Sequence, residues 1–297
     1  MDDTGVPAGS PPPALVIDWW ERAKRDLPWR RTRDPWAVLV SELMLQQTQA
    51  PRVAPRYRAF LARFPTPAAC AGAGPGDVLS AWAGLGYNRR AVSLHRAAVL
   101  IVERHGGRVP ADLESLVALP GVGPYTARAV QVFAFGQGAG VVETNTARVL
   151  ARAVAGRRLG PGEAQALADR LAPAGRSWEW NQALVDLGSL VCRSRKPACH
   201  ECPLSGRYCS WHAAGRSTPD PARGSAGVSG RQSRFAGSDR EGRGRLVAAA
   251  RRGGVAAAGV ALAAGWPEQP DRAVRVADQL VAEGLLRRAA DGGLVLP

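Results

Sequence analysis

The sequence lacks long apolar runs. No hydrophobic segment approaches the roughly 20 residues that a membrane-spanning helix needs. The N-terminal stretch MDDTGVPAGSPPPA is acidic and proline-rich and has no apolar centre, which argues against a signal peptide. These absences disfavour a membrane or secreted protein. We therefore expect a soluble, intracellular chain in a reducing compartment, where disulfide bonds are rare.

Acidic residues are also scarce. The 297 residues include 25 Asp and Glu against 39 Lys and Arg, which gives a formal net charge of +14 and a sequence pI of about 10.9. A basic excess of this size attracts polyanions, and nucleic acid is the commonest of them. An arginine-rich proteome is the alternative explanation for the charge. The composition thus supports a DNA-binding function without establishing it.

No segment alternates apolar and polar residues over the length of a strand until the C-terminus. From residue 14 to 212, apolar residues recur at helical spacing, which predicts an all-α fold. We expect a disordered leader at 1–14 and a linker at 213–234, because the latter is polar and rich in Gly and Ser. Residues 235–297 predict a small helical module that ends in a hairpin at Asp291-Gly292, as in a winged helix.

Cysteine is rare, but four of the five cysteines are crowded into one segment, CRSRKPACHECPLSGRYC. Thiolates at this spacing suit an iron–sulfur cluster or a tetrahedral zinc ion. A disulfide framework would require a secreted chain. We interpret the fifth, Cys70, as a small buried apolar residue. The predicted metal ligands are Cys192, Cys199, Cys202 and Cys209.

In the segment LPGVGPYTA (119–127), Pro120 and two glycines interrupt a helical pattern. Glycine adopts positive φ without steric cost and leaves backbone N–H groups open to an anion. The helix that starts near Thr126 adds its positive end. A plain helical corner is the alternative, but the basic charge and the cysteine cluster favour a seat for a DNA phosphate. The predicted backbone contacts are Gly121, Val122, Gly123 and Thr126.

Two glutamates are candidates for acid–base chemistry. Glu42 lies on a largely apolar predicted helix, where desolvation would favour its protonated form. Glu143 precedes the helix TARVLARAV, which Thr144 or Asn145 would cap, and the positive helix end would favour its ionised form. One neutral and one charged carboxyl group is the pairing that cleaves glycosidic bonds. The alternatives are a solvent-facing Glu42 and simple dipole compensation by Glu143.

Aromatic residues near the predicted loops include Trp29, Tyr87 and Tyr125, which we expect to stack on bases or to wedge into a duplex. Tyr87 follows a glycine-rich turn and precedes Arg89 and Arg90, an order that suits contact with a nucleic-acid backbone. We expect Trp19, Trp20 and Trp82 to be core residues instead.

Taken together, these segments resemble the helix-hairpin-helix DNA glycosylases of the endonuclease III superfamily, and most closely the adenine DNA glycosylases of the MutY family. The resemblance covers about residues 15–212 and rests on LPWR (27–30), SELMLQQTQ (41–49), WAGLGYNRRA (82–91), LPGVGPYTA (119–127), ETNTARVLAR (143–152), NQALVDLGSLVC (181–192) and the cysteine cluster.

The resemblance implies two helical lobes: a six-helix barrel at about 30–136, and a lobe with a [4Fe-4S] cluster at about 15–29 and 137–212. It implies removal of adenine, flipped out of the duplex, where it is mispaired with 8-oxoguanine or guanine. It also implies a bacterial, cytoplasmic enzyme that binds the nucleoid as a monomer. The implied catalytic residues are Glu42 as general acid, Glu143 as stabiliser of the sugar cation, Asn145 and Tyr125.

By the same resemblance, two groups of residues would contact the bases. Gln47 and Tyr87 would probe the duplex around the opposing base. The adenine pocket would comprise Arg25, Trp29, Arg30, Leu45, Gln182 and Val185.

Other functions within the superfamily remain open. Endonuclease III enzymes place a lysine where this chain has Tyr125, and tyrosine cannot form the Schiff base that leads to strand cleavage. A bifunctional lyase is thus disfavoured. A thymine or uracil mismatch glycosylase is also conceivable, although MLQQTQ favours adenine. The remaining alternative is a DNA-binding iron–sulfur protein with impaired catalysis.

Three departures from the family pattern bear on these expectations. Glu143 replaces the family's aspartate, and its extra methylene could move the carboxylate by roughly 1 Å, a displacement that can cost about 100-fold in rate. Six residues separate Cys202 from Cys209, where the family usually has five. The module at 235–297 is too short for the 8-oxoguanine-reading domain of many members.

Overall fold

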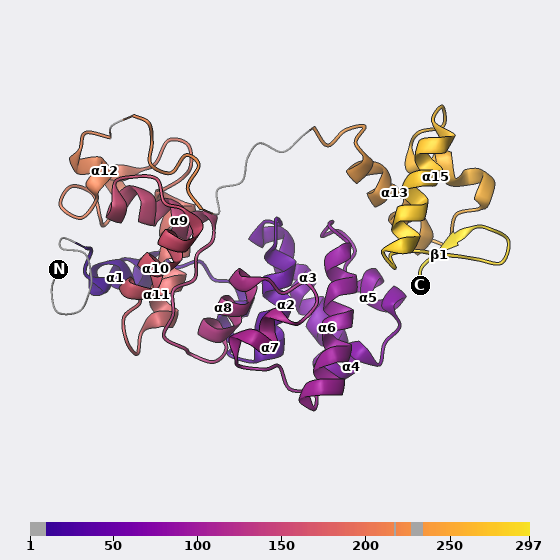
Figure 1. Cartoon of the computed structure of the whole chain (residues 1–297), viewed down its shortest axis with the longest axis horizontal. Coiled ribbons are helices and arrows are strands. Elements are labelled where there is room, and N and C mark those ends of the chain that lie inside the picture. The colour runs from indigo at the N-terminus through magenta and orange to yellow at the C-terminus, as the bar shows by residue number, and fades with distance from the viewer. Residues whose placement is uncertain (1–9, 217, 227–233) are drawn as a thin grey trace. The chain divides into compact units, whose positions relative to one another are not determined.

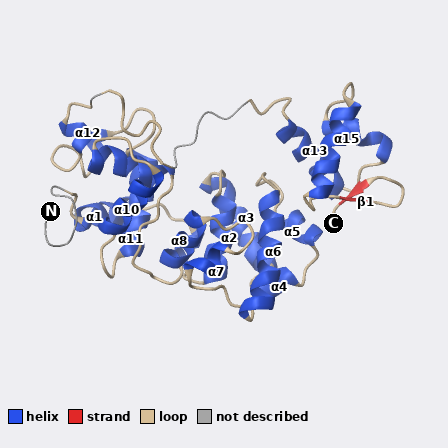
Figure 2. Cartoon of the chain, in the orientation of Figure 1, coloured by secondary structure: helices blue, strands red, loops and turns tan. Residues whose placement is uncertain are grey.

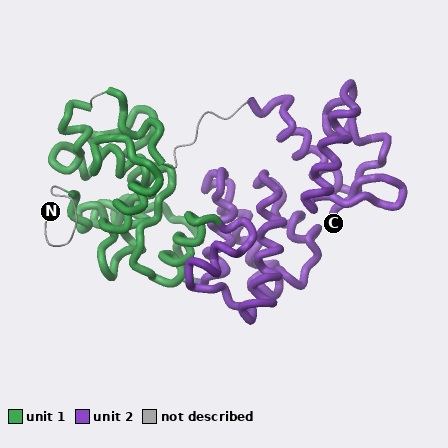
Figure 3. Tube along the Cα trace, in the orientation of Figure 1, with its two compact units in different colours: residues 1–33, 123–231 green, residues 34–122, 232–297 purple. Residues whose placement is uncertain are grey.

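The computed structural model describes residues 10–216, 218–226 and 234–297, and most of them are helical (Figures 1 and 2). The expected all-α fold class is confirmed. The chain divides into two compact units: unit 1 comprises 1–33 and 123–231, and unit 2 comprises 34–122 and 232–297 (Figure 3). In the described ranges, no helix is long and apolar enough to cross a membrane.

Unit 2 begins with a helical segment that surrounds an apolar core. Its central helix is almost wholly buried from Trp36 to Met44 because nearly every side chain in it is apolar. The longest helix is amphipathic, and it ends where Gly106 adopts a left-handed conformation with φ 58°. The helices are α2 (Pro35–Leu45), α3 (Ala50–Arg63), α4 (Pro67–Ala71), α5 (Pro75–Ala81), α6 (Arg89–His105) and α7 (Leu113–Val117).

The C-terminal module also belongs to unit 2. It has three α-helices, a short 3₁₀ turn and a two-stranded antiparallel hairpin, as the winged-helix expectation required. Asp291 accepts a hydrogen bond from the Gly293 N–H, and Gly292 has φ 79°, so the predicted Asp-Gly turn is confirmed. The elements are α13 (Asp239–Arg251), η5 (Ala257–Gly259), α14 (Val260–Ala264), α15 (Pro270–Ala282), β1 (Arg287–Arg288) and β2 (Leu294–Val295).

Unit 1 packs helices from both ends of its sequence around a second core. The N-terminal helix contacts the helix at 177–186, and Trp20, Trp180 and Leu187 are buried in this core. Two α-helices continue directly into π-helical turns, a feature frequent at functional sites. The elements are α1 (Pro13–Ala23), η1 (Pro28–Arg31), α8 (Pro124–Phe133), α9 (Thr144–Val149), η2 (Leu150–Ala155), α10 (Pro161–Leu171), α11 (Ser177–Asp186), η3 (Leu187–Val191), η4 (Cys199–Glu201) and α12 (Ser210–Ala213).

The domain boundaries differ from those predicted. Unit 2 ends its first segment at Val122 rather than near 136, so α8 belongs to unit 1. The predicted leader is also too long, because α1 begins at Pro13; residues 1–9 lie outside the described ranges. Part of the predicted linker packs on unit 1: Ala226 donates its N–H to the Leu159 carbonyl at 3.0 Å. Residues 227–233 of that linker are not described.

Candidate functional site

Glu42 lies on α2 in the core of unit 2. Asp34 caps this helix by accepting a hydrogen bond from the Ala37 N–H at 2.7 Å. The Glu42 residue is 5% exposed, so the solvent-facing alternative is wrong. Burial of a carboxyl group among apolar side chains is costly unless the group is protonated or paired. Its burial is compatible with the general-acid role that the resemblance implies.

Gln47 and Tyr87 lie on the two loops that flank α3 and α6. Both adopt left-handed backbone conformations, with φ 55° and 46°, which are uncommon for residues other than glycine. Tyr87 is 42% exposed. Strained backbone of this kind persists only where surrounding structure holds it. Leu45 is the last residue of α2, immediately before the Gln47 loop.

Arg90 holds both loops in place. Its guanidinium donates hydrogen bonds of 2.6–3.5 Å to oxygens at the end of α2, in the Gln47 loop and in the Tyr87 loop. The residue is 8% exposed, and each of its three guanidinium nitrogens bonds protein oxygens. Burial lowers the pKa of Arg90 to about 10, and the side chain remains charged at neutral pH. Its acceptors are Leu43 O, Met44 O, Gln46 O, Thr48 Oγ1, Leu85 O, Gly86 O and Tyr87 O.

The segment 119–127 forms the expected hairpin between α7 and α8. Gly121 has φ 81°, and a Cβ there would lie 2.7 Å from the Ser93 Cβ, so the turn requires glycine. Gly121 and Gly123 are exposed, as a binding site for a DNA phosphate requires. The Val122 N–H instead bonds the Leu119 carbonyl at 3.1 Å, and Thr126 is 1% exposed. These two residues stabilise the hairpin from inside and are poor candidates for DNA contact.

In unit 1, Glu143 itself caps α9. Its carboxylate accepts hydrogen bonds from the Asn145 N–H at 2.8 Å, the Thr146 N–H at 2.9 Å and the Asn145 Nδ2 at 3.0 Å. The expectation that Thr144 or Asn145 would be the cap is wrong. Burial raises the pKa of Glu143, although these hydrogen bonds and Arg148 act in the opposite direction. Burial therefore opposes the effect of the positive helix end that the sequence predicts.

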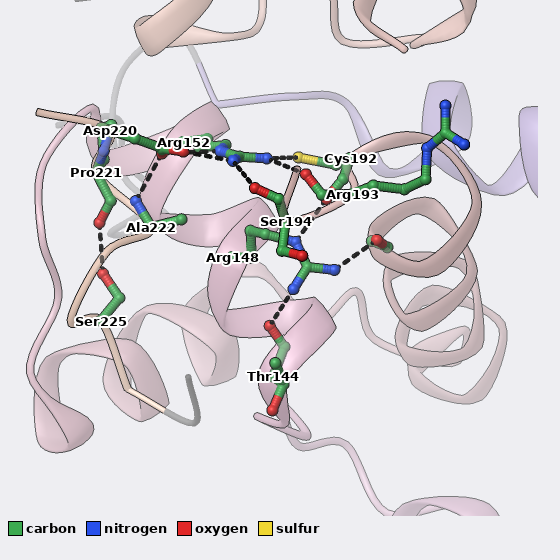
Figure 4. A network of polar contacts seen from close by, with 11 residues as sticks. Thr144, Arg148, Arg152, Cys192, Arg193, Ser194, Asp220, Pro221, Ala222 and Ser225 are labelled. Carbon is green, nitrogen blue, oxygen red and sulfur yellow. Dashed lines mark hydrogen bonds and ion pairs between the residues drawn. The ribbon is translucent and has the colours of Figure 1, made fainter. Parts of the chain in front are cut away.

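Arg148 connects the start of α9 to the cysteine loop (Figure 4). Its Nη2 donates to Asn145 Oδ1 and to the Gly188 carbonyl, both at 2.6 Å, and its Nε donates to the Cys192 carbonyl at 2.6 Å. A Cβ on Gly188 would lie 2.6 Å from the Asn145 Cβ, so glycine allows η3 to approach α9. Asn145 is consequently fixed on both sides, by Glu143 and by Arg148.

Arg25 and Arg30 converge on one buried acid, Asp186. Arg30 makes two hydrogen bonds to the carboxylate, at 2.6 and 2.9 Å, and the Arg25 Nε makes one at 2.6 Å. Trp20 Nε1 donates to the same carboxylate at 3.0 Å. Burial would raise the pKa of Asp186, but the two guanidinium groups outweigh it and lower the pKa. This arrangement fixes the orientation of both predicted pocket arginines.

We call Asp186, Arg25 and Arg30 the Asp186 triad, and the other predicted pocket residues of unit 1 lie near its members in the sequence. Trp29 lies in η1, between Arg25 and Arg30, and is buried. Gln182 lies one turn before Asp186 on α11. Val185 and Tyr125 are half-buried. The Nε of Arg30 is buried and lacks a hydrogen-bond partner among the described residues. Such a donor costs free energy unless a ligand or water satisfies it.

The four clustered cysteines line one small cavity. Cys192 follows η3, Cys199 lies in η4, and Cys209 precedes α12; Leu204 and Trp211 add apolar walls. All four thiols are free of disulfide bonds. In the described ranges, no three His, Cys, Asp or Glu side chains are grouped as a metal site.

The donor set nevertheless fits a thiolate-bound metal centre. Burial raises the pKa of Cys202 to about 12 and also raises that of Cys192 and Cys209, so four thiolates here would need a strong positive charge. Arg152 Nη1 donates to the Cys192 Sγ at 3.5 Å, a contact of the kind that tunes cluster sulfurs.

Arg152 ties the cysteine loop to the segment beyond it (Figure 4). The side chain is 1% exposed and bonds Asp220 through Nε at 2.9 Å and Nη2 at 2.5 Å. It also donates to the Arg193 carbonyl at 2.8 Å and lies over the Trp211 ring at 4.8 Å. This ion pair explains why residues near Asp220 pack on unit 1 instead of forming a linker.

Sequence reasoning missed the packing roles of Arg148, Arg152, Asp186, Asp220 and Arg90. Each has at least one partner 40 or more residues away; Asp220 is half-buried and the other four are buried. Arg148 and Arg152 do have a local signal, since each lies on an apolar helical stretch. Asp186 has the same signal in NQALVDLGSLV, whereas no local pattern distinguishes Asp220 from a surface acid.

The profile of the HhH-GPD superfamily of base excision DNA repair proteins matches residues 40–173. Among solved structures, a thermostable thymine-DNA glycosylase superposes with a TM-score of 0.63 at 30% identity, covering 68% of this chain and 95% of that one. An endonuclease III trapped on DNA shares the fold at a TM-score of 0.60 and 22% identity, covering 69% and 95%. The class of protein is thus a helix-hairpin-helix base excision repair protein.

Relatives found by sequence identify the family within this class. The adenine DNA glycosylase of Mycolicibacterium smegmatis is 41% identical over 288 residues, 96% of this chain and 95% of that one. That of Mycobacterium tuberculosis H37Rv is 42% identical over 290 residues, 95% and 92% of the two chains. The thymine/uracil-DNA glycosylase of Methanothermobacter thermautotrophicus is 32% identical over 204 residues, 67% and 92%. The chain belongs to the adenine DNA glycosylase family.

Proposed function

We propose that this chain removes adenine mispaired with 8-oxoguanine or guanine in duplex DNA, by hydrolysis of the N-glycosidic bond. The observation that carries the proposal is a pair of glutamates at the family's motif positions. Glu42 is buried on an apolar helix of unit 2, and Glu143 is fixed by three hydrogen bonds in unit 1. Two carboxyl groups in unlike environments can divide the acid and electrostatic roles of glycosidic cleavage.

In the proposed reaction, Glu42 donates its proton to a ring nitrogen of adenine, which makes the base a neutral leaving group. The bond between the sugar and the base then breaks with the electron pair going to adenine. Glu143 stabilises the positive charge that develops on the sugar, and water adds to the sugar to give an abasic site. Asn145 and Arg148 act as positioning residues because they fix the Glu143 carboxylate.

Glu143 replaces an aspartate of the family pattern, and its hydrogen bonds bear on this difference. A longer side chain shifts the carboxylate by roughly 1 Å if it is extended. Here the side chain folds back to cap its own helix, with both oxygens engaged. We infer that the cap sets the reach of the carboxylate and that the chain retains catalytic activity.

Adenine selection is assigned to the residues around the Asp186 triad and to the end of α2. Asp186 fixes the orientation of Arg25 and Arg30. The buried Arg30 Nε would then donate to an acceptor on the base. Trp29, Leu45, Gln182 and Val185 would supply apolar surface and one amide. Flipped bases are read by hydrogen bonds to their edges and by stacking between such side chains.

The enzyme is expected to be monofunctional. Strand cleavage by the endonuclease III mechanism needs an amine that attacks the sugar. This chain has two lysines, Lys24 and Lys196, and neither occupies the motif position of Tyr125. Lys24 is paired with Glu21 at the end of α1, and Lys196 lies in the cysteine loop. The abasic product should therefore remain unbroken until alkali is added.

We propose a [4Fe-4S] cluster on Cys192, Cys199, Cys202 and Cys209. Such a cluster folds the loop around it, and the loop carries Arg193, Arg195, Lys196 and Arg207, which can meet phosphates. Aerobically purified protein should contain about four irons per chain and absorb visible light. Zinc in place of iron, with no visible absorbance, would contradict this assignment. We further expect a monomer that works on chromosomal DNA in a bacterial cytoplasm.

The catalytic assignment is tested by single-turnover base release from a duplex with adenine opposite 8-oxoguanine. Glu42→Gln and Glu143→Gln should each slow release by about 10²- to 10⁴-fold, since each removes a group that acts on the leaving base or the sugar. Glu143→Asp should retain measurable activity. Equal rates for Glu143→Gln and the wild type would remove Glu143 from the mechanism. Faster release of thymine opposite guanine would instead favour a thymine glycosylase.

A further inference from the structure

A large groove lies within unit 2, where the C-terminal module meets the segment 34–122. Its volume is about 960 Å³. One wall is formed by the loops 46–49 and 85–88 with the adjoining ends of α3 and α6. The other wall is formed by Phe235, α13 and the end of α15. We call this cavity the module groove.

Ion pairs and hydrogen bonds hold the two walls together. Glu283, just after α15, pairs with Arg243 of α13 at 2.5 Å and with Arg89 of α6 at 3.5 Å. Arg251 donates to the Leu79 carbonyl at 2.9 Å, and the Gly76 N–H donates to the Pro297 carbonyl at 3.1 Å. The module groove is thus a feature of one folded unit.

The charge of the module groove is strongly positive. Of the described residues that line it, five are arginines and none is Asp or Glu: Arg52, Arg89, Arg90, Arg240 and Arg243. Glu283 offsets part of this charge from outside the lining. Glu283 pairs with Arg89 and Arg243, and five guanidinium groups against one carboxylate leave a net positive charge that attracts an anion. Arginine also matches the geometry of phosphate oxygens.

The same cavity has exposed aromatic rings and amides. Tyr87 is 42% exposed and Phe235 is 59% exposed. An arginine lies near each ring: Arg90 is 5.5 Å from the Tyr87 centroid, and Arg240 is 5.8 Å from that of Phe235. Gln47, Gln49 and Asn88 add amide groups that can bond base edges. Aromatic rings interleaved with arginines are characteristic of surfaces that bind nucleotides.

From this combination we propose that the C-terminal module is a DNA-binding part of the protein. Phe235, Arg240 and Arg243 bind a short phosphodiester segment together with the loops of Gln47 and Tyr87, and Phe235 stacks on an exposed base. The inference rests on the proposed function in one respect, since it takes the nucleic acid to be the duplex that carries the mispair.

The test compares two double variants of the module. Phe235→Ala with Arg240→Ala removes one exposed ring and one arginine from the module groove. Val274→Ala with Arg275→Ala is the matched control, because it removes an exposed apolar side chain and an exposed arginine from α15 outside the groove. Arg243 is left intact, since its pairing with Glu283 holds the walls together.

Binding is measured by fluorescence anisotropy on a duplex with 8-oxoguanine opposite a 2′-fluoro-adenosine, which resists cleavage, over a series of salt concentrations. The groove variant should bind at least about 10-fold more weakly than the wild type, as loss of one stacked base predicts. Its slope of log K against log salt should fall by about 0.9, for one lost phosphate contact. The control should match the wild type.

Equal affinities and equal slopes for the groove and control variants would overturn the proposal. If only the groove variant has a changed melting temperature, Phe235 has a structural role, and Phe235→Leu is then measured. If Phe235 stacks on a base, Phe235→Leu should restore the stability but still bind the duplex weakly. If Phe235→Leu also restores binding, the stacking role is overturned. Because the duplex is not cleaved, this result does not depend on base release. Failure of the wild type to release adenine would contradict the proposed function and leave the binding comparison intact.

Discussion

Two buried arginines, one in each unit, hold loops in the same manner but balance their charges differently. Arg152 in unit 1 bonds the cysteine-loop carbonyls and also pairs with Asp220. Arg90 in unit 2 bonds only carbonyl and hydroxyl oxygens among the described residues. Burial opposes the charge in both cases. The bonds to Asp220 and Cys192 nevertheless raise the pKa of Arg152, whereas the pKa of Arg90 falls to about 10.

The difference extends to the rest of each unit. In unit 1, Asp186 pairs with both Arg25 and Arg30, although the buried Arg148 bonds only uncharged oxygens, as Arg90 does. In unit 2, Arg90 lies at the edge of a groove with four other arginines and no lining acid among its described residues. We conclude that carboxylates balance part of the buried positive charge of unit 1, whereas the arginines that line the groove of unit 2 leave a net positive charge that suits a phosphate backbone.

The largest expected effect is that of Asp186→Asn. The substitution leaves Arg30 buried without its counter-ion, and loss of one member of a buried pair typically costs about 3–5 kcal/mol. Urea denaturation followed by tryptophan fluorescence measures the loss. Asp26→Asn is the matched control in the same unit, because Asp26 is 72% exposed and pairs with Arg31; it should cost less than about 1 kcal/mol. Equal losses would show that the buried triad adds no stability.

Arg90→Lys should cost about 2–3 kcal/mol. A lysine ammonium has three donors and cannot satisfy seven oxygens at the end of α2 and in two loops. Buried acceptors that lose their donors are costly. Because the Gln47 and Tyr87 loops lose their anchor, binding to the mispaired duplex should weaken as well. Thermal melting and anisotropy titration measure the two effects. Retained stability with unchanged binding would mean that charge alone, not the guanidinium geometry, holds the loops.

Asp220→Asn should cost about 1.5–3 kcal/mol, as hydrogen bonds to charged groups do. The substitution leaves Arg152 with only uncharged acceptors, as Arg90 has. The pKa of Asp220 is lowered in the folded protein because its bonds to Arg152 outweigh burial. Its stabilisation is thus complete above the unfolded-state pKa of about 3.9 and is lost as the pH falls through the lower folded-state pKa. A wild-type advantage that grows on acidification would contradict this.

Glu143→Gln is the smallest effect and has the opposite sign. The pKa of Glu143 is raised by burial, so ionisation above the unfolded-state value of about 4.3 opposes folding. The glutamine variant should therefore be more stable than the wild type at pH 7, by less than about 1 kcal/mol, since it keeps one carbonyl acceptor for the cap. Melting temperatures at pH 7 and pH 4 should converge at the lower pH. A less stable variant at pH 7 would show that the ionised cap stabilises α9.

Local patterns predicted the elements whose causes are local. The apolar spacing around Glu42 gave its buried helix, Asp291-Gly292 gave the hairpin, and Gly121 gave the turn before α8. The motif order identified the family. These features depend on residues within one or two turns of one another, where periodicity and turn chemistry are informative.

Long-range ion pairs were beyond these patterns. Asp220 lies 68 residues from Arg152, and a polar, glycine-rich segment around it predicts a linker unless that partner is known. Arg90 follows an exposed tyrosine, so it looks like a surface cation, although seven oxygens from two loops bury it. The boundary at Val122 likewise depends on how α8 packs against α11, which spacing within α8 does not indicate.

The most direct test is the fate of a duplex with one adenine opposite 8-oxoguanine under excess wild-type protein. Free adenine and strand breaks are quantified in parallel, before and after alkali. We expect stoichiometric adenine, an intact strand before alkali and a single break afterwards. Tight binding with no free adenine would contradict the assignment of Glu42 and Glu143 as a catalytic pair, and a strand break before alkali would contradict the monofunctional mechanism.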